Sequence, residues 1–281
     1  MMQKIKNIPA ELPKPETIDI EALRSGLSDG SIELVCVLGP TASGKTRYAV
    51  GLARELGGEI ISADSRQVYR GMDIGTGKDL AEYGEVPYHL IDIANPGDGY
   101  NVYRFKQDFF AAYDDIRSRG RAPILCGGTG LYINAVTSGY DFRSNKPLSQ
   151  PAGSGIAGQG GSPTVMPDPI GHPVSPRTFF IGTLVSREVR NARIDARLDA
   201  RLQEGMTDEI RGLLDRGVPP SVLLSYGLEY KFVTQYLLGD LSYEDMRSHL
   251  AIAIHQFAKR QMTWFRGMER SGTRIHWTEV Q

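Results

Sequence analysis

The sequence predicts an α/β fold: a doubly wound parallel sheet with flanking helices and a helical C-terminal region. The first observation is that short β-branched apolar runs alternate with segments of helical periodicity, which is typical of strand–helix–strand units. The second is that these runs end in loops rich in glycine or aspartate. Since the carboxyl ends of parallel strands meet at one rim, we expect four loops to converge there. They begin at Gly39, Asp64, Asp92 and Gly127.

The chain begins with a polar lead-in, residues 1–30, in which several prolines occur and a short helix is expected over residues 18–27. We assign no chemistry to it. One domain, residues 31–281, follows, and its first strand is the apolar run at residues 32–38. A helix is predicted after the next loop, because its apolar side chains have helical spacing. These are Tyr48, Ala49, Leu52, Ala53 and Leu56.

The rest of the sheet is predicted from four further apolar runs, with one helix between the second and third of them. The strands are expected at residues 59–63, 88–93, 122–126 and 178–184, and the helix at residues 102–119. Before the last strand the composition changes, with six glycines and six prolines between residues 151 and 176. This composition favours a flexible loop, which we expect to interrupt the domain at about residues 144–176.

The C-terminal region is predicted to be helical and arginine-rich. Arg193, Arg197 and Arg201 recur at every fourth position beside an apolar stripe, which indicates an amphipathic helix from residue 187 with a basic face. Such a face is most often solvated, with Asp195 and Asp199 as its partners. Further helices are expected at residues 207–216 and from Ser242, followed by an edge strand at residues 273–278.

Composition excludes several classes of protein. The chain of 281 residues is 41% hydrophobic and 23% charged, and none of its apolar runs approaches the ~20 residues that a membrane-spanning helix needs. We therefore expect a cytoplasmic protein without membrane contact. We also expect a monomer. A net charge of −1 provides no global attraction to nucleic acid, so any RNA contact must come from local basic patches. Cys36 and Cys126 lie in predicted strands, which favours reduced core thiols.

The loop after the first strand carries the most specific motif. Residues 39–46, GPTASGKT, fit the pattern G-x-x-x-x-G-K-[ST] of a P-loop NTPase-like fold. In that pattern backbone N–H groups surround phosphate oxygens, the lysine neutralises them and the hydroxyl ligates Mg²⁺. The helix that follows directs the positive N-terminal end of its dipole toward this loop, which favours a bound anion. The motif thus predicts a phosphate site with Mg²⁺ as cofactor, and leaves open which phosphate it binds.

Three other rim residues are candidates for chemistry, each with a simpler alternative. Asp64, at the end of the second predicted strand, suits a general base or merely caps a turn. Asp92 suits a second-sphere acid for Mg²⁺, or it caps the turn before Pro96. Thr129 lies between glycines, where it either reaches a ligand oxygen or only accompanies a sharp turn.

Five ordered motifs together resemble the tRNA dimethylallyltransferases, enzymes that prenylate N6 of an adenosine next to the anticodon. The match spans roughly residues 32–140 and 178–270. The motifs are GPTASGKT at 39–46, DSRQVY at 64–69 with DIGTGK at 73–78, HLID at 89–92, GGTGLY at 127–132 and KRQMTW at 259–264. Five motifs in one order are far more specific than the phosphate loop alone.

The resemblance implies a role for each candidate residue. It implies that Asp64 is the base for the adenine amino group and that Thr129 lines the channel where the two substrates meet. Lys45 would neutralise the leaving diphosphate. The diphosphate of dimethylallyl diphosphate is assigned to Gly39, Thr41, Ala42, Ser43, Gly44, Lys45, Thr46 and to candidates Arg187, Arg193 and Arg197. The RNA or acceptor is assigned to Asp64, Ser65, Gln67, Thr129, Lys259, Arg260 and Gln261, and Mg²⁺ to Thr46 and Asp92.

The chain departs from the family in one place. Family members have a helical insertion that holds the anticodon stem-loop, between the Gly-Gly-Thr loop and the later helices. Here residues 139–143 run almost directly into residues 144–149, which resemble the far side of that insertion. Most of the insertion is therefore expected to be missing, so RNA binding would depend on the basic segments 187–201 and 259–266.

The sequence leaves alternatives to tRNA prenylation open. A prenyltransferase acting on a free adenine nucleotide, as in cytokinin-forming enzymes, needs less machinery to hold RNA. A P-loop small-molecule kinase would use Asp64 to orient an acceptor hydroxyl. A further alternative is an RNA-binding paralogue without turnover, against which the intact Lys45, Thr46 and Asp64 argue.

Overall fold

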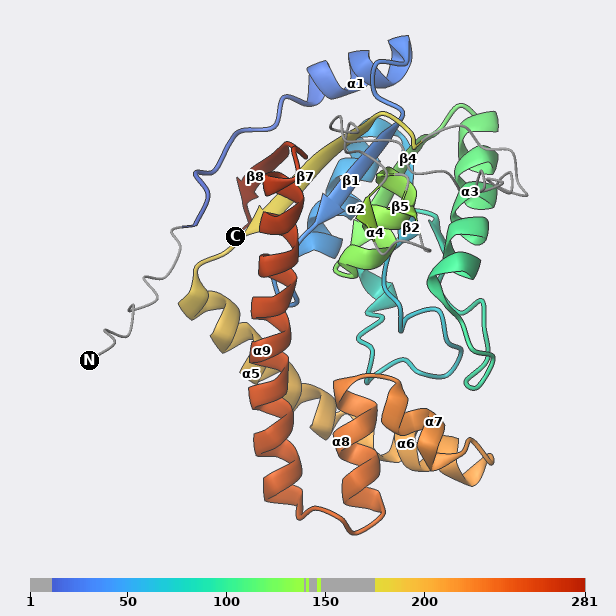
Figure 1. Ribbon diagram of the computed structural model, residues 1–281, viewed down its shortest axis with the longest axis vertical. Helices are drawn as coiled ribbons and strands as arrows, with labels where there is room; N and C mark the ends of the chain where they lie inside the picture. Colours follow the sequence, from blue (N-terminus) through green and yellow to red (C-terminus); the bar gives the residue numbers. More distant parts are fainter. Residues whose placement is uncertain (1–11, 139, 142–145, 148–174, 281) are drawn as a thin grey trace, which may run out of the picture.

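The fold is built on one parallel sheet, with a helical lobe beyond one of its rims (Figure 1). The computed structural model describes residues 12–138, 140–141, 146–147 and 175–280 of the chain. Six strands pair in parallel in the order β3-β2-β4-β1-β7-β8. They are β1 (Leu34–Leu38), β2 (Gly58–Ser62), β3 (Tyr88–His89), β4 (Ala122–Gly127), β7 (Thr178–Leu184) and β8 (Ile275–Glu279). The predicted doubly wound parallel sheet is confirmed.

The described helices cover the sheet and form the lobe. They are α1 (Ile20–Asp29), α2 (Lys45–Leu56), α3 (Val102–Ser118), α4 (Gly130–Thr137), α5 (Arg187–Gln203), α6 (Met206–Asp215), α7 (Pro220–Ser225), α8 (Leu228–Leu237) and α9 (Tyr243–Arg270), with a short 3₁₀ helix at Leu80–Glu82. A small antiparallel pair joins β5 (Tyr140–Asp141) to β6 (Lys146–Pro147). In Figure 1 α9 runs from the sheet down to α8, so this helix connects the two parts.

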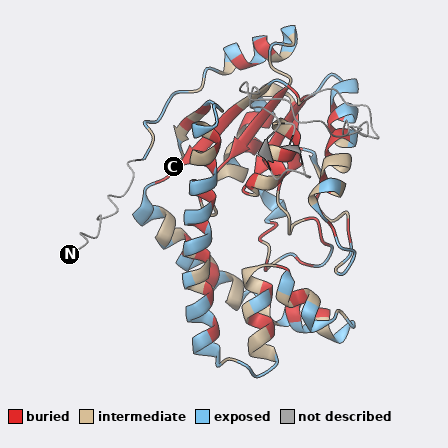
Figure 2. Cartoon of the chain, in the orientation of Figure 1, coloured by how far each residue is buried: buried red, intermediate tan, exposed pale blue. Residues whose placement is uncertain are grey.

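The core lies on both faces of the sheet because the central strand β1 is buried throughout (Figure 2). Successive side chains of a strand point to opposite faces. Accordingly Leu34, Cys36 and Leu38 join the larger core with α3, α4 and α9, while Val35 and Val37 join the smaller core with α1 and α2. Cys36 and Cys126 are buried free thiols, as predicted.

Most predicted elements are found, with small shifts at their ends. The lead-in helix, the arginine-rich helix and the last edge strand are all present. Ser242 caps α9 by accepting from the backbone N–H of Asp245, as its sequence position predicts. The helices α4, α7 and α8 were not predicted. Within the described ranges, no helix is long and apolar enough to cross a membrane.

The third strand is shorter than predicted. It ends at His89, because Leu90 and Asp92 adopt left-handed backbone conformations with φ of 63° and 57°. The chain then bonds to the loop after β2, with Asp92 N–H donating to the Gln67 carbonyl at 3.1 Å. The predicted flexible loop at about residues 144–176 lies almost entirely outside the described residues, so it and the domain boundaries stay predictions.

Candidate active site

A cavity of about 350 Å³ lies at the carboxyl ends of β1, β2 and β4, where the loops were expected to converge. Lys45 and Thr46 line it from the start of α2, Asp64 from the end of β2 and Thr129 from the end of β4. Helices α5, α8 and α9 supply the opposite wall. Three loops that are far apart in the sequence therefore face one cavity.

The phosphate loop is held from two sides. Gly44 precedes α2 with a φ of 78°, which is the left-handed conformation that favours glycine. Ser43 Oγ lies 2.7 Å from Thr183 Oγ1 on β7, and Gln261 Oε1 accepts from Thr41 N–H at 2.8 Å. Because Gln261 Nε2 also donates to the Gly128 carbonyl at 3.0 Å, α9 clamps the loops after β1 and β4 together.

Lys45 places a cation inside the cavity. Burial lowers the pKa of its ammonium group, while Asp64 and other nearby groups partly oppose that shift. Its Nζ lies 3.5 Å from the Pro40 carbonyl, and among the described residues it forms no ion pair. A half-buried cation without a carboxylate partner is stabilised by an anionic ligand.

Asp64 and Thr129 lie on the same side of this cavity and serve partly as structural groups. Asp64 Oδ1 accepts from the backbone N–H of Arg66 at 2.9 Å and of Gln67 at 3.4 Å. The turn-capping alternative is therefore observed, and it orients a carboxylate that lines the cavity. Thr129 Oγ1 accepts from Ser65 N–H at 3.2 Å, which joins the loops after β2 and β4.

The candidate arginines differ in position. Arg197 lines the cavity and donates to Asp79 Oδ2 at 3.0 Å, so its side chain is fixed. Arg193 lines an adjoining opening of about 510 Å³ on the outer side of Lys45 and Thr46. Arg187 is exposed and lines neither space, so the structure does not bring this candidate to the phosphate loop.

Arg201 is a cavity residue that the sequence assignment left out. Burial lowers the pKa of its guanidinium to about 10. Its Nη2 is buried and, within the described part of the chain, has no hydrogen-bond partner. The sequence could have indicated Arg201, because Arg193, Arg197 and Arg201 recur at every fourth position. Arg201 lies one helical turn after Arg197 and therefore on the same face of the helix. Glu229 and Tyr226 also line the cavity and carried no motif that would have indicated them.

Asp92 does not lie beside Thr46, contrary to the predicted shared metal site. Its carboxylate accepts from Lys78 Nζ, and it lines neither of the two spaces around Thr46. The reason is the left-handed turn that ends β3 early and directs Asp92 to the loop after β2. Lys78 is itself buried and also donates to the Tyr69 carbonyl at 2.6 Å. This aspartate therefore stabilises a loop.

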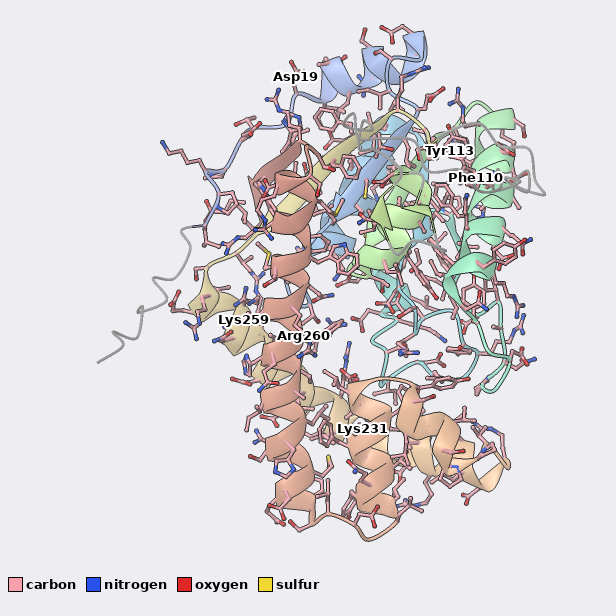
Figure 3. The ribbon with its side chains drawn as sticks, in the orientation of Figure 1. Asp19, Phe110, Tyr113, Lys231, Lys259 and Arg260 are labelled. Carbon is pink, nitrogen blue, oxygen red and sulfur yellow. The ribbon has the colours of Figure 1, made fainter. Side chains whose placement is uncertain are left out.

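Some of the residues expected to bind the acceptor line the cavity, and others do not. Ser65, Gln67, Arg260 and Gln261 line the cavity. Lys259 is exposed and does not, although it neighbours Arg260 on the middle of α9 (Figure 3). Adjacent helical residues point about 100° apart, which explains the difference.

Comparison with known proteins identifies the family. The model of the IPP transferases matches residues 67–159 and 166–268, and that of the isopentenyl transferases matches residues 32–85. The chain belongs to the IPP transferase family. The break in the match, between residues 159 and 166, falls within the Gly/Pro-rich stretch.

Curated relatives of this IPP transferase are similar over almost their whole length. "tRNA dimethylallyltransferase 1" of Parabacteroides distasonis is 49% identical over 288 residues, covering 89% of this chain and 93% of the relative. "tRNA dimethylallyltransferase 2" of Shewanella sediminis is 46% identical, covering 89% and 94%. The first alignment is longer than the 281 residues present here, so that relative carries residues without a counterpart in this chain.

Solved structures share the fold of this IPP transferase. The full-length tRNA isopentenylpyrophosphate transferase of Bacillus halodurans superposes with a TM-score of 0.71 at 32% identity, covering 88% of this chain and 89% of that one. The corresponding enzyme of Staphylococcus epidermidis gives a TM-score of 0.70 at 28% identity, covering 88% and 92%. The P-loop fold expected from the sequence is thus the fold of these transferases.

Proposed function

We propose that this chain transfers a dimethylallyl group from dimethylallyl diphosphate to N6 of an adenosine next to the anticodon of tRNA, releasing diphosphate. The observation that carries the proposal is the cavity in which the phosphate loop, the half-buried cations Lys45 and Arg201, and the Asp64 carboxylate lie together. The curated relatives, named for this reaction, support it.

The phosphate loop suits a diphosphate that leaves. The N–H groups at the start of α2, with Lys45, Arg197 and Arg201, provide preorganised positive charge. As the bond between C1 of the dimethylallyl group and the diphosphate oxygen breaks, its electron pair moves to that oxygen. The developing charge meets donors that need no reorganisation, and one such donor is worth about 3 kcal/mol.

Asp64 suits the role of base. An exocyclic amine conjugated to a purine ring is a weak nucleophile, so it benefits from a placed proton acceptor. As the amine nitrogen bonds to C1, its proton passes to the Asp64 carboxylate. The two backbone bonds to Oδ1 keep that carboxylate oriented, and Thr129 lies at the same wall.

Mg²⁺ fits this site as a companion of the diphosphate. The described residues contain no group of three or more His, Cys, Asp or Glu side chains able to hold a metal. The Thr46 hydroxyl lines both spaces beside the loop and is the protein ligand we propose, the remaining ligands being phosphate oxygens and water. When bound, Mg²⁺ would neutralise charge on the leaving diphosphate. Asp92 is not part of this site.

One experiment separates this proposal from its alternatives. Purified protein, labelled dimethylallyl diphosphate and Mg²⁺ are incubated together with unmodified tRNA, AMP or ADP, each acceptor in its own reaction, and ATP turnover is measured in a further reaction. We expect label in tRNA. Label in AMP or ADP instead would favour free-nucleotide prenylation, and ATP turnover without prenyl transfer would favour a kinase. A cytoplasmic, monomeric state remains our expectation, testable by fractionation and light scattering.

A further inference from the structure

A carboxylate of the helical lobe is bound by the backbone of a sheet-side loop. Glu209 lies in the first turn of α6, and its Oε2 accepts from the N–H groups of Asp73 and Ile74 at 2.7 Å each. Its Oε1 accepts from Gly75 N–H at 3.1 Å and from the Tyr230 hydroxyl at 2.7 Å. Three consecutive N–H groups on one anion form an anion-binding concavity, here filled by a side chain more than 130 residues away in the sequence.

The loop that binds Glu209 has little freedom to move. A Cβ added at Gly75 would lie 2.8 Å from the Tyr230 ring, so the backbone touches the lobe directly. Beyond this contact, Lys78 Nζ donates to Asp73 Oδ1 and to the Tyr69 carbonyl at 2.6 Å each. The segment 73–78, which we name the wall loop, is therefore fixed in its first half by Glu209, while Lys78 at its end bonds back to Asp73 at its start.

The wall loop forms part of the active-site cavity. Gly75, Thr76 and Gly77 line that cavity. The Gly77 carbonyl accepts from Gln67 Nε2 at 3.2 Å and from Arg197 Nη2 at 3.4 Å. The Arg197 and Arg201 guanidinium groups both pack against Gly77, since a Cβ there would overlap them. The position of this backbone thus sets where the two arginines can lie.

We propose that Glu209 is a positioning residue for the transfer reaction. By occupying the N–H groups of residues 73–75, it fixes the wall loop, and through Gly77 it orients Arg197 and Arg201 toward the diphosphate. This inference rests on the proposed function. Removing the carboxylate leaves three N–H groups and the Tyr230 hydroxyl without their partner, so water must enter or the loop must shift. Glu209 itself does not line the cavity.

The chain offers a matched set of variants. Glu209→Ala removes all four bonds, and Tyr230→Phe removes only the hydroxyl bond to Oε1. Glu209→Gln keeps one carbonyl oxygen, which can still accept from Asp73 and Ile74 at the Oε2 position. Asp208→Ala is the control, because Asp208 is the preceding exposed acid, and among the described residues its ion pair is a local one with Arg211.

Two measurements test the anchor without requiring turnover. In Glu209→Ala, hydrogen exchange at the amides of residues 73–75 should rise by about tenfold or more, because their acceptor is gone. The affinity for inorganic diphosphate should fall by about tenfold, because the arginines lose their fixed orientation. Asp208→Ala should change neither. Unchanged exchange or unchanged diphosphate affinity in Glu209→Ala would overturn the proposal.

Steady-state kinetics separate positioning from simple stabilisation. At a temperature where all variants are folded, we expect kcat/KM for the donor to fall about tenfold or more in Glu209→Ala, with Glu209→Gln and Tyr230→Phe intermediate. A Glu209→Ala variant with a lower melting temperature but wild-type kcat and donor KM would show a purely structural role. That result would refute the inference. If the wild-type protein itself transfers no prenyl group, the proposed function fails, while exchange and diphosphate affinity still decide the anchor.

Discussion

The two walls of the active-site cavity are built in different ways. The sheet-side wall consists of loops at strand ends, in which backbone groups and short side chains bond to one another, as Thr129 does to Ser65 N–H and Asp64 to Arg66 N–H. The helical wall consists of long side chains from α5, α8 and α9 that reach inward, among them Arg197 and Arg201.

The difference indicates that the two walls have different roles. Backbone N–H groups held by a sheet provide fixed donors, which suit the charge that develops on a leaving group. Long charged side chains supply charge at a distance, and they lose conformational entropy unless other groups fix them. The helical wall therefore depends on contacts such as Arg197 with Asp79 and Glu209 with the wall loop. Variants of each wall should accordingly fail in distinct ways.

The largest effect is expected at the sheet-side base. Asp64→Asn retains an oxygen for the turn bonds but cannot take up the amine proton, so kcat should fall by about 10²–10⁴-fold. Diphosphate affinity should stay near the wild-type value. Single-turnover prenyl transfer and diphosphate titration measure the two quantities. Wild-type turnover in this variant would remove Asp64 as the base.

A second large effect is expected at the phosphate loop. Lys45→Ala removes a cavity cation, so donor affinity and the rate of transfer should fall together, the rate by about 10²-fold. The measurements are donor KM and kcat at saturating tRNA. If the rate stays normal, other residues stabilise the leaving group, and the assignment of this role to the sheet-side wall is wrong.

An intermediate effect is expected from the helical wall. Arg201→Gln removes a cavity guanidinium whose buried Nη2 has no hydrogen-bond partner among the described residues, so diphosphate affinity should weaken by about tenfold. Arg187→Gln changes an exposed side chain and should leave that affinity unaltered. Calorimetric titration with diphosphate makes the comparison. Equal losses in both variants would contradict the arrangement of α5 described above.

The smallest effect concerns stability of the sheet away from the cavity. Arg119, followed by His89, lowers the pKa of Glu59 on β2 from 4.5 to about 2. Because the folded pKa lies below the unfolded one, the contribution is fully present above pH 4.5 and is lost as the pH falls toward 2. Wild-type protein should melt a few degrees above Glu59→Gln at neutral pH, and this gap should close in acid. A gap independent of pH would exclude the linkage.

The sequence indicated the sheet-side wall far better than the helical wall. The motifs at Gly39–Thr46, Asp64 and Gly127–Thr129 were assigned to one rim, and the structure brings them together. Of the arginine candidates, Arg197 faces the cavity while Arg187 does not, and Arg201 was left out. Asp92 was predicted beside Thr46, but a left-handed turn directs it to Lys78.

The sequence by itself determined the parallel sheet, the phosphate loop and the family, because these depend on local periodicity and on contiguous motifs whose backbone does the binding. Only the tertiary structure decided which arginines reach the cavity, that Asp92 serves a loop, and that Glu209 binds the wall loop. The physical reason is that these contacts join segments separated by many residues. Their geometry depends on how α5 and α6 pack against the sheet-side loops, which no local pattern encodes.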